Sequence, residues 1–245
     1  AQGTYEQLLE SSPSFRRMAR VIWKGCLPTE YHTLIVWMLK QRKIGQKISD
    51  AWYIFRFSRK QIKTSFAIIF WKNVRNSGFI IVQKRAVFLD RDGVINVNHG
   101  YVHDVKSFKF VDGIFEVARA AHDCGYALIV VTNQSGIGRG YYSEKQFNQL
   151  TDWMCNEFLN AGAPIEKVYF SPFHPTAGIG AYRKDDVSRK PRPGMIHKAQ
   201  HEMNLNLKSS ILIGDNAIDI QAGIAAGVGL NILFAQKKNS KLIGL

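Results

Sequence analysis

The stretch that decides the fold is AVFLDRDGVINVNHGYV, residues 86–102. It begins with an apolar run and ends that run in two aspartates, Asp90 and Asp92, with Gly93 directly after them. An apolar run of this length, bounded by polar residues, is typical of a short buried strand. The sequence therefore predicts a strand whose end carries two carboxylates separated by one residue.

Downstream of this stretch, short apolar runs alternate with segments of helical periodicity. Ser143 and Gln146 form a capping-box pattern at the start of one such segment, and Gly125 is placed to end another. This alternation predicts an α/β fold, a Rossmann-like doubly wound parallel sheet with helices on both faces. We expect strands at 86–90, 127–132, 167–170, 210–215 and 230–234, and helices at 113–125, 143–162, 194–204 and 216–227.

Polar side chains follow four of these predicted strands. An isolated pair of aspartates is most often a helix cap or a surface charge. Ligands of parallel sheets, however, bind at the carboxyl ends of the strands, and four polar groups at one edge predict a site there. The residues concerned are Asp90, Asp92, Thr132, Asn133, Arg189, Lys190 and Asp215.

These residue types suit phosphoryl transfer. The Asp90 carboxylate can attack phosphorus, while Asp92 protonates the leaving oxygen and then deprotonates water. Carboxylates beside a phosphate dianion need a divalent cation, and oxygen ligands favour Mg²⁺, held by the Asp90 and Asp215 side chains with the Asp92 backbone carbonyl. Lys190 and the Thr132 hydroxyl can then stabilise the phosphoryl oxygens.

In order along the chain, DRDGV, VVTN, RKPRPG and GDNAID resemble the four motifs of the haloacid dehalogenase (HAD) superfamily of phosphatases, over residues 86 to about 235. Within it, DRDGVINVNHGYV, TNQSGIGRG, QFNQLTDWM and SRKPRPGM resemble the family of D-glycero-D-manno-heptose 1,7-bisphosphate 7-phosphatases. The resemblance implies Mg²⁺-dependent hydrolysis of a sugar phosphate through an aspartyl phosphate. The product would serve nucleotide-activated heptose and lipopolysaccharide biosynthesis.

The resemblance also implies a role for each matching position. Asp90 would be the nucleophile and Asp92 the acid and base, with Thr132 and Lys190 stabilising the phosphoryl group. Asp90, Asp92 and Asp215 would hold the metal. The implied substrate contacts are Asn98, His99, Gly100, Tyr101, Thr132, Asn133, Gln134, Ser135, Arg189 and Lys190.

The chain departs from the family pattern at two places. The family commonly has a loop with Cys and His zinc ligands, and the matching positions are Ser171, Phe173, Asp186 and Ser188, so we expect no zinc. A basic residue usually follows the metal-binding aspartate, where this chain has Asn216. The short connection from Asp90 to Thr132 leaves no room for a large cap domain. A short flap reaching Tyr101 and the loop 171–188 are therefore expected to wall the site.

Residues 1–84 differ in composition from residues 85–245, which predicts two parts: a basic, aromatic-rich extension and a phosphatase domain. The first part carries 15 Lys and Arg against 4 Asp and Glu, and the second 18 against 15, within a net charge of +14. Residues 1–19 resemble the C-terminal tail of an ABC exporter, which suggests a fragment or a fusion and implies no ATPase activity. The alternation of apolar and basic clusters in residues 20–84 predicts one of two things. The segment either makes weak contact with a membrane surface or a partner, or is an extension without a dedicated function.

Three alternatives to the heptose phosphatase stay open: a histidinol-phosphate phosphatase, a polynucleotide 3′-phosphatase and a non-catalytic binding protein. GIGRG and HGYV favour the heptose side. Against nucleic acid as a partner, most of the positive charge lies outside the catalytic part and no kinase P-loop is present. No apolar run reaches the length of a membrane span and no secretory signal pattern is present, so we expect a cytoplasmic protein. We also expect a monomer.

Overall fold

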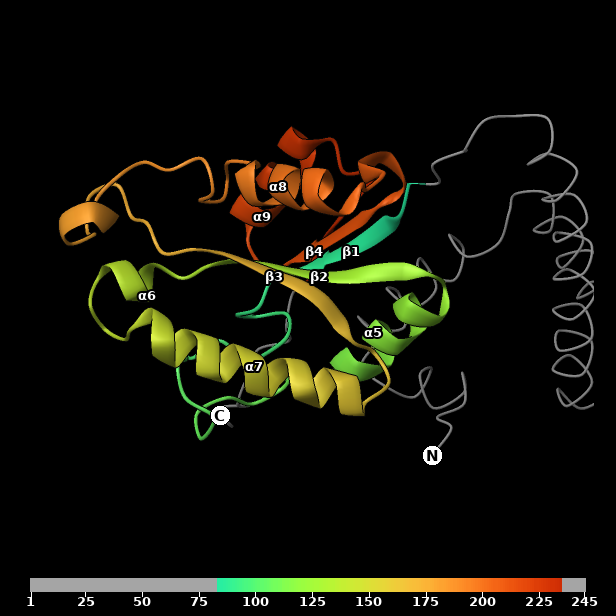
Figure 1. Cartoon of the computed structure of the whole chain (residues 1–245), viewed down its shortest axis with the longest axis horizontal. Coiled ribbons are helices and arrows are strands. Elements are labelled where there is room, and N and C mark those ends of the chain that lie inside the picture. Colours follow the sequence, from blue (N-terminus) through green and yellow to red (C-terminus); the bar gives the residue numbers. More distant parts are fainter. Residues whose placement is uncertain (1–82, 235–245) are drawn as a thin grey trace, which may run out of the picture. The chain divides into compact units, whose positions relative to one another are not determined.

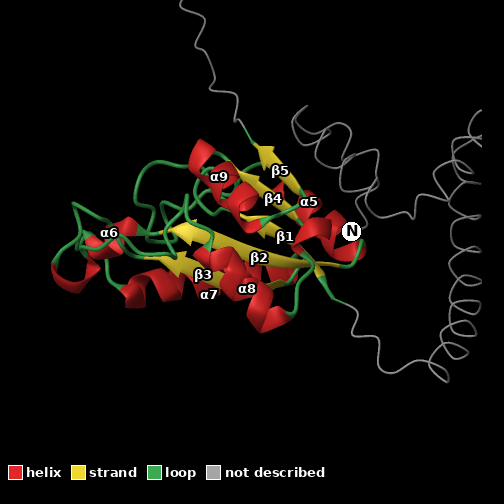
Figure 2. Cartoon of the chain, turned by 90° about the horizontal axis from the view of Figure 1, so that it is seen from above, coloured by secondary structure: helices red, strands yellow, loops and turns green. Residues whose placement is uncertain are grey.

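Five parallel strands form the central sheet of the computed structural model, which describes residues 83–234 (Figure 1). They are β1 (Arg85–Leu89), β2 (Tyr126–Asn133), β3 (Ile165–Ser171), β4 (Ile211–Gly214) and β5 (Leu230–Leu233). Their order across the sheet is β3-β2-β1-β4-β5, as Figure 2 shows from above. Every neighbouring pair is parallel. The predicted doubly wound sheet is therefore confirmed, with each strand at its expected place.

Helices cover both faces of this sheet (Figure 1). On one face lie α5 (Ile114–Asp123) and α7 (Glu144–Asn160), and on the other α8 (Gly194–Met203) and α9 (Ala217–Ala226). The short α6 (Ser135–Gly138) follows β2, and two 3₁₀ turns are η1 (Gly180–Tyr182) and η2 (Leu207–Ser209). The four long helices confirm the prediction. Helix α6 was not predicted, because its four residues are too few to show a helical period.

The apolar run of β1 supplies both layers of the core. Val87 and Leu89 join the cluster beneath α5 and α7, whereas Ala86 and Phe88 join the cluster beneath α8 and α9. All four side chains are buried. A strand covered on both faces needs apolar residues at every position, which explains why the stretch does not alternate.

Local signals set the helix starts. The Ser143 hydroxyl accepts from the Gln146 N–H and the Gln146 side chain reaches back to the Ser143 N–H, so the predicted capping box begins α7. A second capping box, formed by Asn216 and Asp219, begins α9 and was not predicted. Gly125 follows α5 with φ +79°, the left-handed conformation that glycine adopts readily after a helix.

The strand order places a topological switch point beside β1. The chain runs from β1 outward through β2 and β3, then returns to add β4 and β5 on the other side of β1. In open parallel sheets, the crevice at the carboxyl ends of such strands receives ligands. The ends of β1, β2 and β4 therefore meet at the predicted position.

The connection between β1 and α5 is irregular and contains no cap domain, as predicted. Val102 and Phe108 are buried, and Phe108 makes an edge contact with Trp153 of α7 at 5.4 Å between ring centroids. The part at Asn98–Tyr101 is exposed and forms the expected short flap. Anchoring by Val102 and Phe108 keeps this flap at the carboxyl edge of the sheet.

The predictions for residues 1–82, including the resemblance of residues 1–19 to an exporter tail, lie outside the described residues. The division of the chain at residues 84 and 85 stays a prediction. The Lys84 N–H donates to the Asn204 carbonyl and the Asn206 N–H donates to the Lys84 carbonyl. The described fold therefore includes Lys84. Across residues 83–234, none of the helices combines the length and the apolar character that crossing a membrane requires.

Candidate active site

A pocket of about 390 Å³ opens at the carboxyl ends of β1, β2 and β4. It brings together most of the residues that the sequence pointed to, from four separate parts of the chain. His99 and Arg189 do not line it. The predicted residues that do are Asp90, Asp92, Asn98, Gly100, Tyr101, Thr132, Asn133, Gln134, Ser135, Lys190 and Asp215, and the others are Gly136, Tyr142, Asn216, Ile218 and Asp219.

Asp90 lies directly after β1, and its two carboxylate oxygens differ in their hydrogen bonds. Its Oδ1 accepts from the Arg91 N–H at 2.8 Å and from Lys190 Nζ at 2.8 Å. Its Oδ2 accepts no hydrogen bond from residues 83–234. Burial raises the pKa of Asp90 to about 6, against the opposing effect of Lys190. The carboxylate is thus fixed at one oxygen and available for chemistry at the other.

Lys190 is buried, with 3% of its side chain exposed, and all three of its ammonium hydrogens have acceptors. Nζ lies 2.8 Å from Asp90 Oδ1, 2.8 Å from the Val131 carbonyl and 2.7 Å from Asp219 Oδ1. Burial disfavours the charged ammonium of Lys190, but the attraction of the Asp90 and Asp219 carboxylates is stronger, so the pKa of Lys190 is raised. The residue is therefore a fixed cation at the floor of the pocket.

Asp219 is the main residue that sequence reasoning missed. It is buried in the first turn of α9, where its Oδ2 accepts from the Asn216 N–H at 3.0 Å while its Oδ1 binds Lys190. Because it lies four residues after Asp215, one helical turn on, it returns to the same edge of the sheet. An acidic residue at that spacing after a strand-ending aspartate was the available signal.

The Asp92 side chain is surrounded by donors. Its Oδ1 accepts from Arg91 Nη2 at 2.9 Å and from Asn96 Nδ2 at 3.1 Å. Its Oδ2 accepts from Arg91 Nη2 at 2.9 Å and from Gln134 Nε2 at 2.9 Å. Arg91 is itself fully buried and also donates to the Val102 carbonyl. The guanidinium offsets the Asp92 charge and fixes the carboxylate beside the pocket.

The TNQ sequence after β2 contributes three different side chains. The Thr132 hydroxyl is buried and accepts from Gln134 Nε2 at 2.8 Å, and Gln134 Oε1 accepts from the Tyr142 hydroxyl at 2.6 Å. The Asn133 side chain forms two hydrogen bonds with the Lys190 backbone. Its Nδ2 donates to the Lys190 carbonyl and its Oδ1 accepts from the Lys190 N–H, both at 3.0 Å. Burial raises the pKa of Tyr142 to about 12, so its hydroxyl keeps the hydrogen that it donates.

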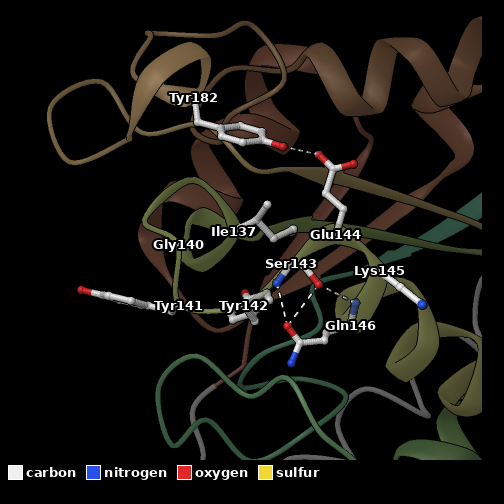
Figure 3. Close-up of a pocket in the computed structure, with 9 residues that line it drawn as sticks. All are labelled: Ile137, Gly140, Tyr141, Tyr142, Ser143, Glu144, Lys145, Gln146 and Tyr182. Carbon is white, nitrogen blue, oxygen red and sulfur yellow. Dashed lines mark hydrogen bonds between the residues drawn. The ribbon is translucent and has the colours of Figure 1, made fainter.

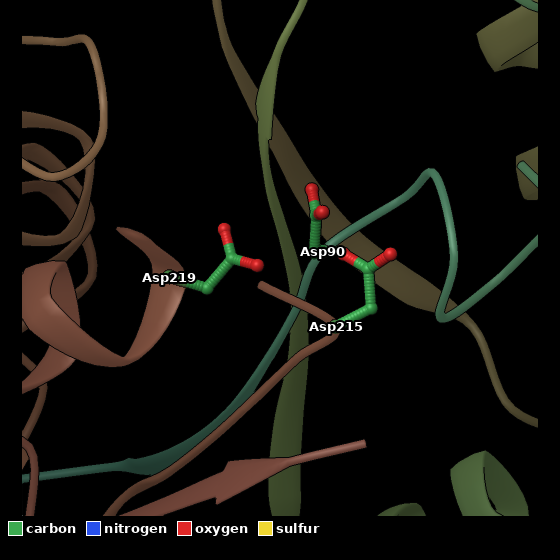
Figure 4. Close-up of side chains that lie close together, drawn as sticks. All are labelled: Asp90, Asp215 and Asp219. Carbon is green, nitrogen blue, oxygen red and sulfur yellow. The ribbon is translucent and has the colours of Figure 1, made fainter. Parts of the chain in front are cut away.

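Three carboxylates lie close together at the pocket. Asp90, Asp215 and Asp219 each offer an oxygen, and these oxygens lie within 4.8 Å of one another (Figure 4). Burial, followed by the charge of Asp219, raises the pKa of Asp215. The side chain of Asp92, a predicted metal ligand, is not part of this cluster. Hard oxygen donors at this spacing fit Mg²⁺, and the close approach of Gly93 to Asp215 leaves no space for a Cβ.

The positions matched to a zinc loop are held by hydrogen bonds instead of soft ligands. Ser188 Oγ lies 3.0 Å from Ser171 Oγ and 2.7 Å from Asp186 Oδ1, and Lys184 pairs with Asp186 at 2.9 Å. Burial opposes ionisation of Asp186, but hydrogen bonds from Ser188 and Lys184 outweigh it and hold its pKa at about 2. Lys184 Nζ also lies 4.1 Å from the centroid of the Phe173 ring.

Three predicted substrate contacts differ in their surroundings. Arg189 is half-buried and its Nη1 donates to the Phe173 carbonyl at 2.9 Å, so part of its guanidinium is committed to the loop. Tyr101 does line the pocket, with the unusual φ of +51°, and packs edge-on against Tyr141 at 4.7 Å between centroids. His99 is exposed on the flap.

The loop 171–188 does not line this pocket, contrary to expectation. Its Tyr182 lines a neighbouring hollow of about 580 Å³ over α6 and the start of α7 (Figure 3). There the Tyr182 hydroxyl donates to Glu144 at 3.0 Å, and Gln146 is used in the helix cap with Ser143. The loop reaches the site only through its end, which carries Lys190.

A family model described as "Polynucleotide kinase 3 phosphatase" matches residues 87–240. A curated D-glycero-alpha-D-manno-heptose-1,7-bisphosphate 7-phosphatase of Burkholderia mallei is 55% identical over 161 residues, which cover 66% of this chain and 85% of that protein. A D-glycero-beta-D-manno-heptose-1,7-bisphosphate 7-phosphatase of Vibrio cholerae is 49% identical over 150 residues, covering 61% and 81%.

One solved structure shares this fold. It is the D,D-heptose 1.7-bisphosphate phosphatase from B. bronchiseptica complexed with magnesium and phosphate. It aligns with a TM-score of 0.53 and 25% identity, covering 60% of this chain and 78% of that one.

Proposed function

The chain belongs to the HAD-like phosphatase family that includes the heptose-1,7-bisphosphate 7-phosphatases, and on that premise we propose how its residues hydrolyse a sugar phosphate. The substrate we propose is D-glycero-D-manno-heptose 1,7-bisphosphate, which would lose its 7-phosphate. One observation carries the proposal. Asp90, whose Oδ2 accepts no hydrogen bond from residues 83–234, lines a polar pocket together with a buried lysine and a further carboxylate of its acidic cluster, Asp215.

In the first step, Asp90 Oδ2 attacks the phosphorus of the substrate. The bond between phosphorus and the sugar oxygen breaks, the electron pair leaves with that oxygen, and Asp92 gives it a proton. Every protein group that contacts the Asp92 side chain is a hydrogen-bond donor. A proton on Asp92 therefore finds its acceptor on the substrate side. The products are the free sugar hydroxyl and an acyl phosphate on Asp90.

In the second step, water attacks the phosphorus of the acyl phosphate. Asp92, now ionised, takes a proton from this water, and the bond between phosphorus and Asp90 Oδ2 breaks. Inorganic phosphate leaves and both carboxyl groups regain their starting states. The Lys190 ammonium and the Thr132 hydroxyl lie at the pocket floor, where they can stabilise phosphoryl charge in both steps.

Mg²⁺ is the cofactor that the donor set fits, and it would be held by the side chains of Asp90 and Asp215 with the Asp92 backbone carbonyl. When bound, it offsets the charge of the phosphoryl group and of the carboxylates around it. Asp219 completes the acidic cluster, but both its oxygens already accept hydrogen bonds, so we assign it to Lys190. We expect no zinc, because the loop positions hold two hydroxyls, a phenyl ring and a carboxylate.

The choice of a sugar phosphate over a nucleic acid rests on the relatives and on charge. The family model is named for a polynucleotide phosphatase, but the relatives at 43–55% identity are heptose phosphatases. Residues 85–245 carry 18 basic against 15 acidic residues, which is a weak charge for binding a polyanion. The printed names of the relatives include both anomers, so the anomer is not assigned. We further propose a cytoplasmic monomer.

Phosphate release from a panel of substrates tests the proposal. The panel contains both anomers of the heptose bisphosphate, histidinol phosphate and a 3′-phosphorylated oligonucleotide, each with and without Mg²⁺. We expect kcat/KM to be at least tenfold higher for one heptose anomer than for the other substrates, and no turnover without Mg²⁺. Faster release from the oligonucleotide or from histidinol phosphate would replace the proposed substrate. Turnover that persists in EDTA would overturn the metal requirement.

A further inference from the structure

We propose that Gln134 is a positioning residue that holds the acid and base Asp92 and the phosphoryl-binding Thr132 in one rigid unit, with Tyr142 as its support. The inference rests on the proposed function, because it assigns Gln134 a task within that reaction. It differs from the substrate contact implied by resemblance, since the side-chain amide is committed to protein groups.

The geometry of this unit is complete. Gln134 Nε2 donates to Asp92 Oδ2 at 2.9 Å and to Thr132 Oγ1 at 2.8 Å, which uses both of its hydrogens. Gln134 Oε1 accepts from the Tyr142 hydroxyl at 2.6 Å. Gln134 is 2% exposed and Thr132 is 1% exposed, so water does not compete for these bonds. The side chain therefore makes its contacts with the protein and has no amide hydrogen left for the substrate.

Chemistry fixes the orientation of the amide. If the amide were turned over, its oxygen would face the Asp92 carboxylate, and two acceptors would meet without a hydrogen between them. The nitrogen must therefore face Asp92 and Thr132. The oxygen then faces Tyr142, whose hydroxyl can satisfy it only by donating.

This orientation determines where the Thr132 hydroxyl points. Its oxygen already accepts from Gln134, and no bond within residues 83–234 uses the hydroxyl as a donor. Thr132 lines the pocket, so its single hydrogen is left for an oxygen of a bound phosphoryl group. Gln134 thus prepares Thr132 as a donor before substrate arrives, which is the arrangement that stabilises charge most effectively.

The same amide sets the rotation of the Asp92 carboxylate. Arg91 spans both carboxylate oxygens, and Asn96 holds Oδ1. Gln134 is the side chain that holds Oδ2 from the Thr132 side. Without Gln134, the Asp92 carboxylate would keep its ion pair with Arg91 but lose the hydrogen bond that fixes its position relative to Thr132. Misplacement on the scale of 1 Å can lower a rate roughly 100-fold.

Tyr142 is held firmly enough to act as the support. A Cβ on Gly136 would lie 2.2 Å from its ring, so only glycine allows this approach. The His103 ring also stacks on the Tyr142 ring, with 5.1 Å between the centroids and an interplanar angle of 4°. Contacts with His103 and with Gly136 of α6 therefore hold the Tyr142 ring.

The test compares Gln134→Ala and Tyr142→Phe with a matched control, Gln146→Ala, in the full chain with saturating Mg²⁺. Gln146 also has a bonded amide but lies in the cap of α7. Two substrates are used, the heptose bisphosphate and p-nitrophenyl phosphate, whose leaving group needs no proton. Single-turnover release of the leaving group and steady-state kcat and KM are measured for each.

We expect Gln134→Ala to lower kcat on the heptose bisphosphate roughly 10- to 100-fold with KM within threefold of wild type. Single-turnover release should fall at least threefold more for the sugar than for p-nitrophenol. Tyr142→Phe should lower kcat less than Gln134→Ala, and Gln146→Ala should leave kcat unchanged. In an Asp92→Asn background, the effect of Gln134→Ala on sugar release should be at least threefold smaller, because only the positioning of Thr132 remains to be lost.

A large rise in KM with kcat unchanged would overturn the proposal, because Gln134 would then bind substrate directly. Equal kcat losses in Gln134→Ala and Gln146→Ala would also overturn it, because the role would be one of general stability. Failure of the proposed substrate has a different signature. The wild-type protein would then not hydrolyse the heptose bisphosphate, and the test would rest on kcat for p-nitrophenyl phosphate. A tenfold lower kcat in Gln134→Ala would support the proposal, and an unchanged kcat would overturn it.

Discussion

Replacing Asp219 with Asn separates two roles that its position could serve, metal ligand and partner of Lys190. The Asp219 side chain is 3% exposed, and its Oδ1 lies 2.7 Å from the equally buried Lys190 ammonium. Its Oδ2 accepts from the Asn216 N–H at the start of α9. Since both oxygens are engaged, we expect the second role.

The structure sets the size of the stability loss. Removing one partner of a buried ion pair costs about 3–5 kcal/mol, because the other charge stays buried. Asn keeps an oxygen that can accept from Lys190 or Asn216, and Lys190 keeps Asp90 and the Val131 carbonyl. We therefore expect the lower part of that range, about 3 kcal/mol. For a domain of this size, that lowers Tm by roughly 6–12 °C.

Metal affinity distinguishes the two roles. Asp219→Asn and Asp215→Asn each remove one negative charge near the proposed Mg²⁺ site, so their long-range Coulomb losses are similar. Only Asp215→Asn also removes a proposed ligand. We expect the Mg²⁺ activation constant to rise at least ~10-fold more in Asp215→Asn, a difference of about 1.4 kcal/mol.

The assay is phosphate release against Mg²⁺ concentration, together with Mg²⁺ titration calorimetry and thermal unfolding of both variants. An equal or larger loss of Mg²⁺ affinity in Asp219→Asn would show that Asp219 is a ligand and refute the assignment. An unchanged Tm would show that the ion pair with Lys190 contributes little. Either result would require a different account of how Lys190 is held.

Four further predictions concern other parts of the chain. Asp90→Asn should lower kcat at least ~1000-fold in phosphate release without lowering Tm, since burial already disfavours its ionised form. Asp186→Asn should lower the free energy of unfolding, measured in urea at pH 6, by about 1 kcal/mol, a value that allows for screening by solvent. Because folding depresses the pKa of Asp186 to about 2, the difference in free energy of unfolding between variant and wild type should disappear as the pH falls from about 4 toward 2. The fragment 83–245 should fold, with full activity, and aggregation would show that the preceding residues belong to the fold. Arg189→Ala should raise KM for a bisphosphate more than for a monophosphate, and equal changes would mean that its bond to Phe173 is its whole role.

The fold and the chemical centre could be predicted because their signals are local. Each strand is a short apolar run, and a parallel sheet brings the carboxyl ends of its strands together whatever their order. Asp90, Thr132, Lys190 and Asp215 could therefore be placed at one edge from sequence alone. The capping box at Ser143 was equally local, since it depends on two residues three apart.

The parts that were missed depend on contacts between distant side chains. Asp219 resembles an ordinary first-turn acid of a helix, and its task as a partner of Lys190, 29 positions earlier, depends on an ion pair that the fold forms between them. Gln134 could be placed at the pocket, but its sequence does not say that the amide turns inward to Asp92. The loop 171–188 was expected at the site, yet its path depends on weak hydrogen bonds that have no periodic signature.

The charges of the site account for a single divalent cation. Four carboxylates gather here with two buried cations: Arg91 pairs with Asp92, and Lys190 is shared between Asp219 and Asp90. Asp90 and Asp215 are the ones whose pKa values burial raises, which means that their ionised forms lack full compensation. One Mg²⁺ would carry the charge that these two carboxylates need. A second divalent cation would have to displace Lys190 or Arg91, each of which is held by several hydrogen bonds, so the geometry favours one metal ion and a fixed lysine.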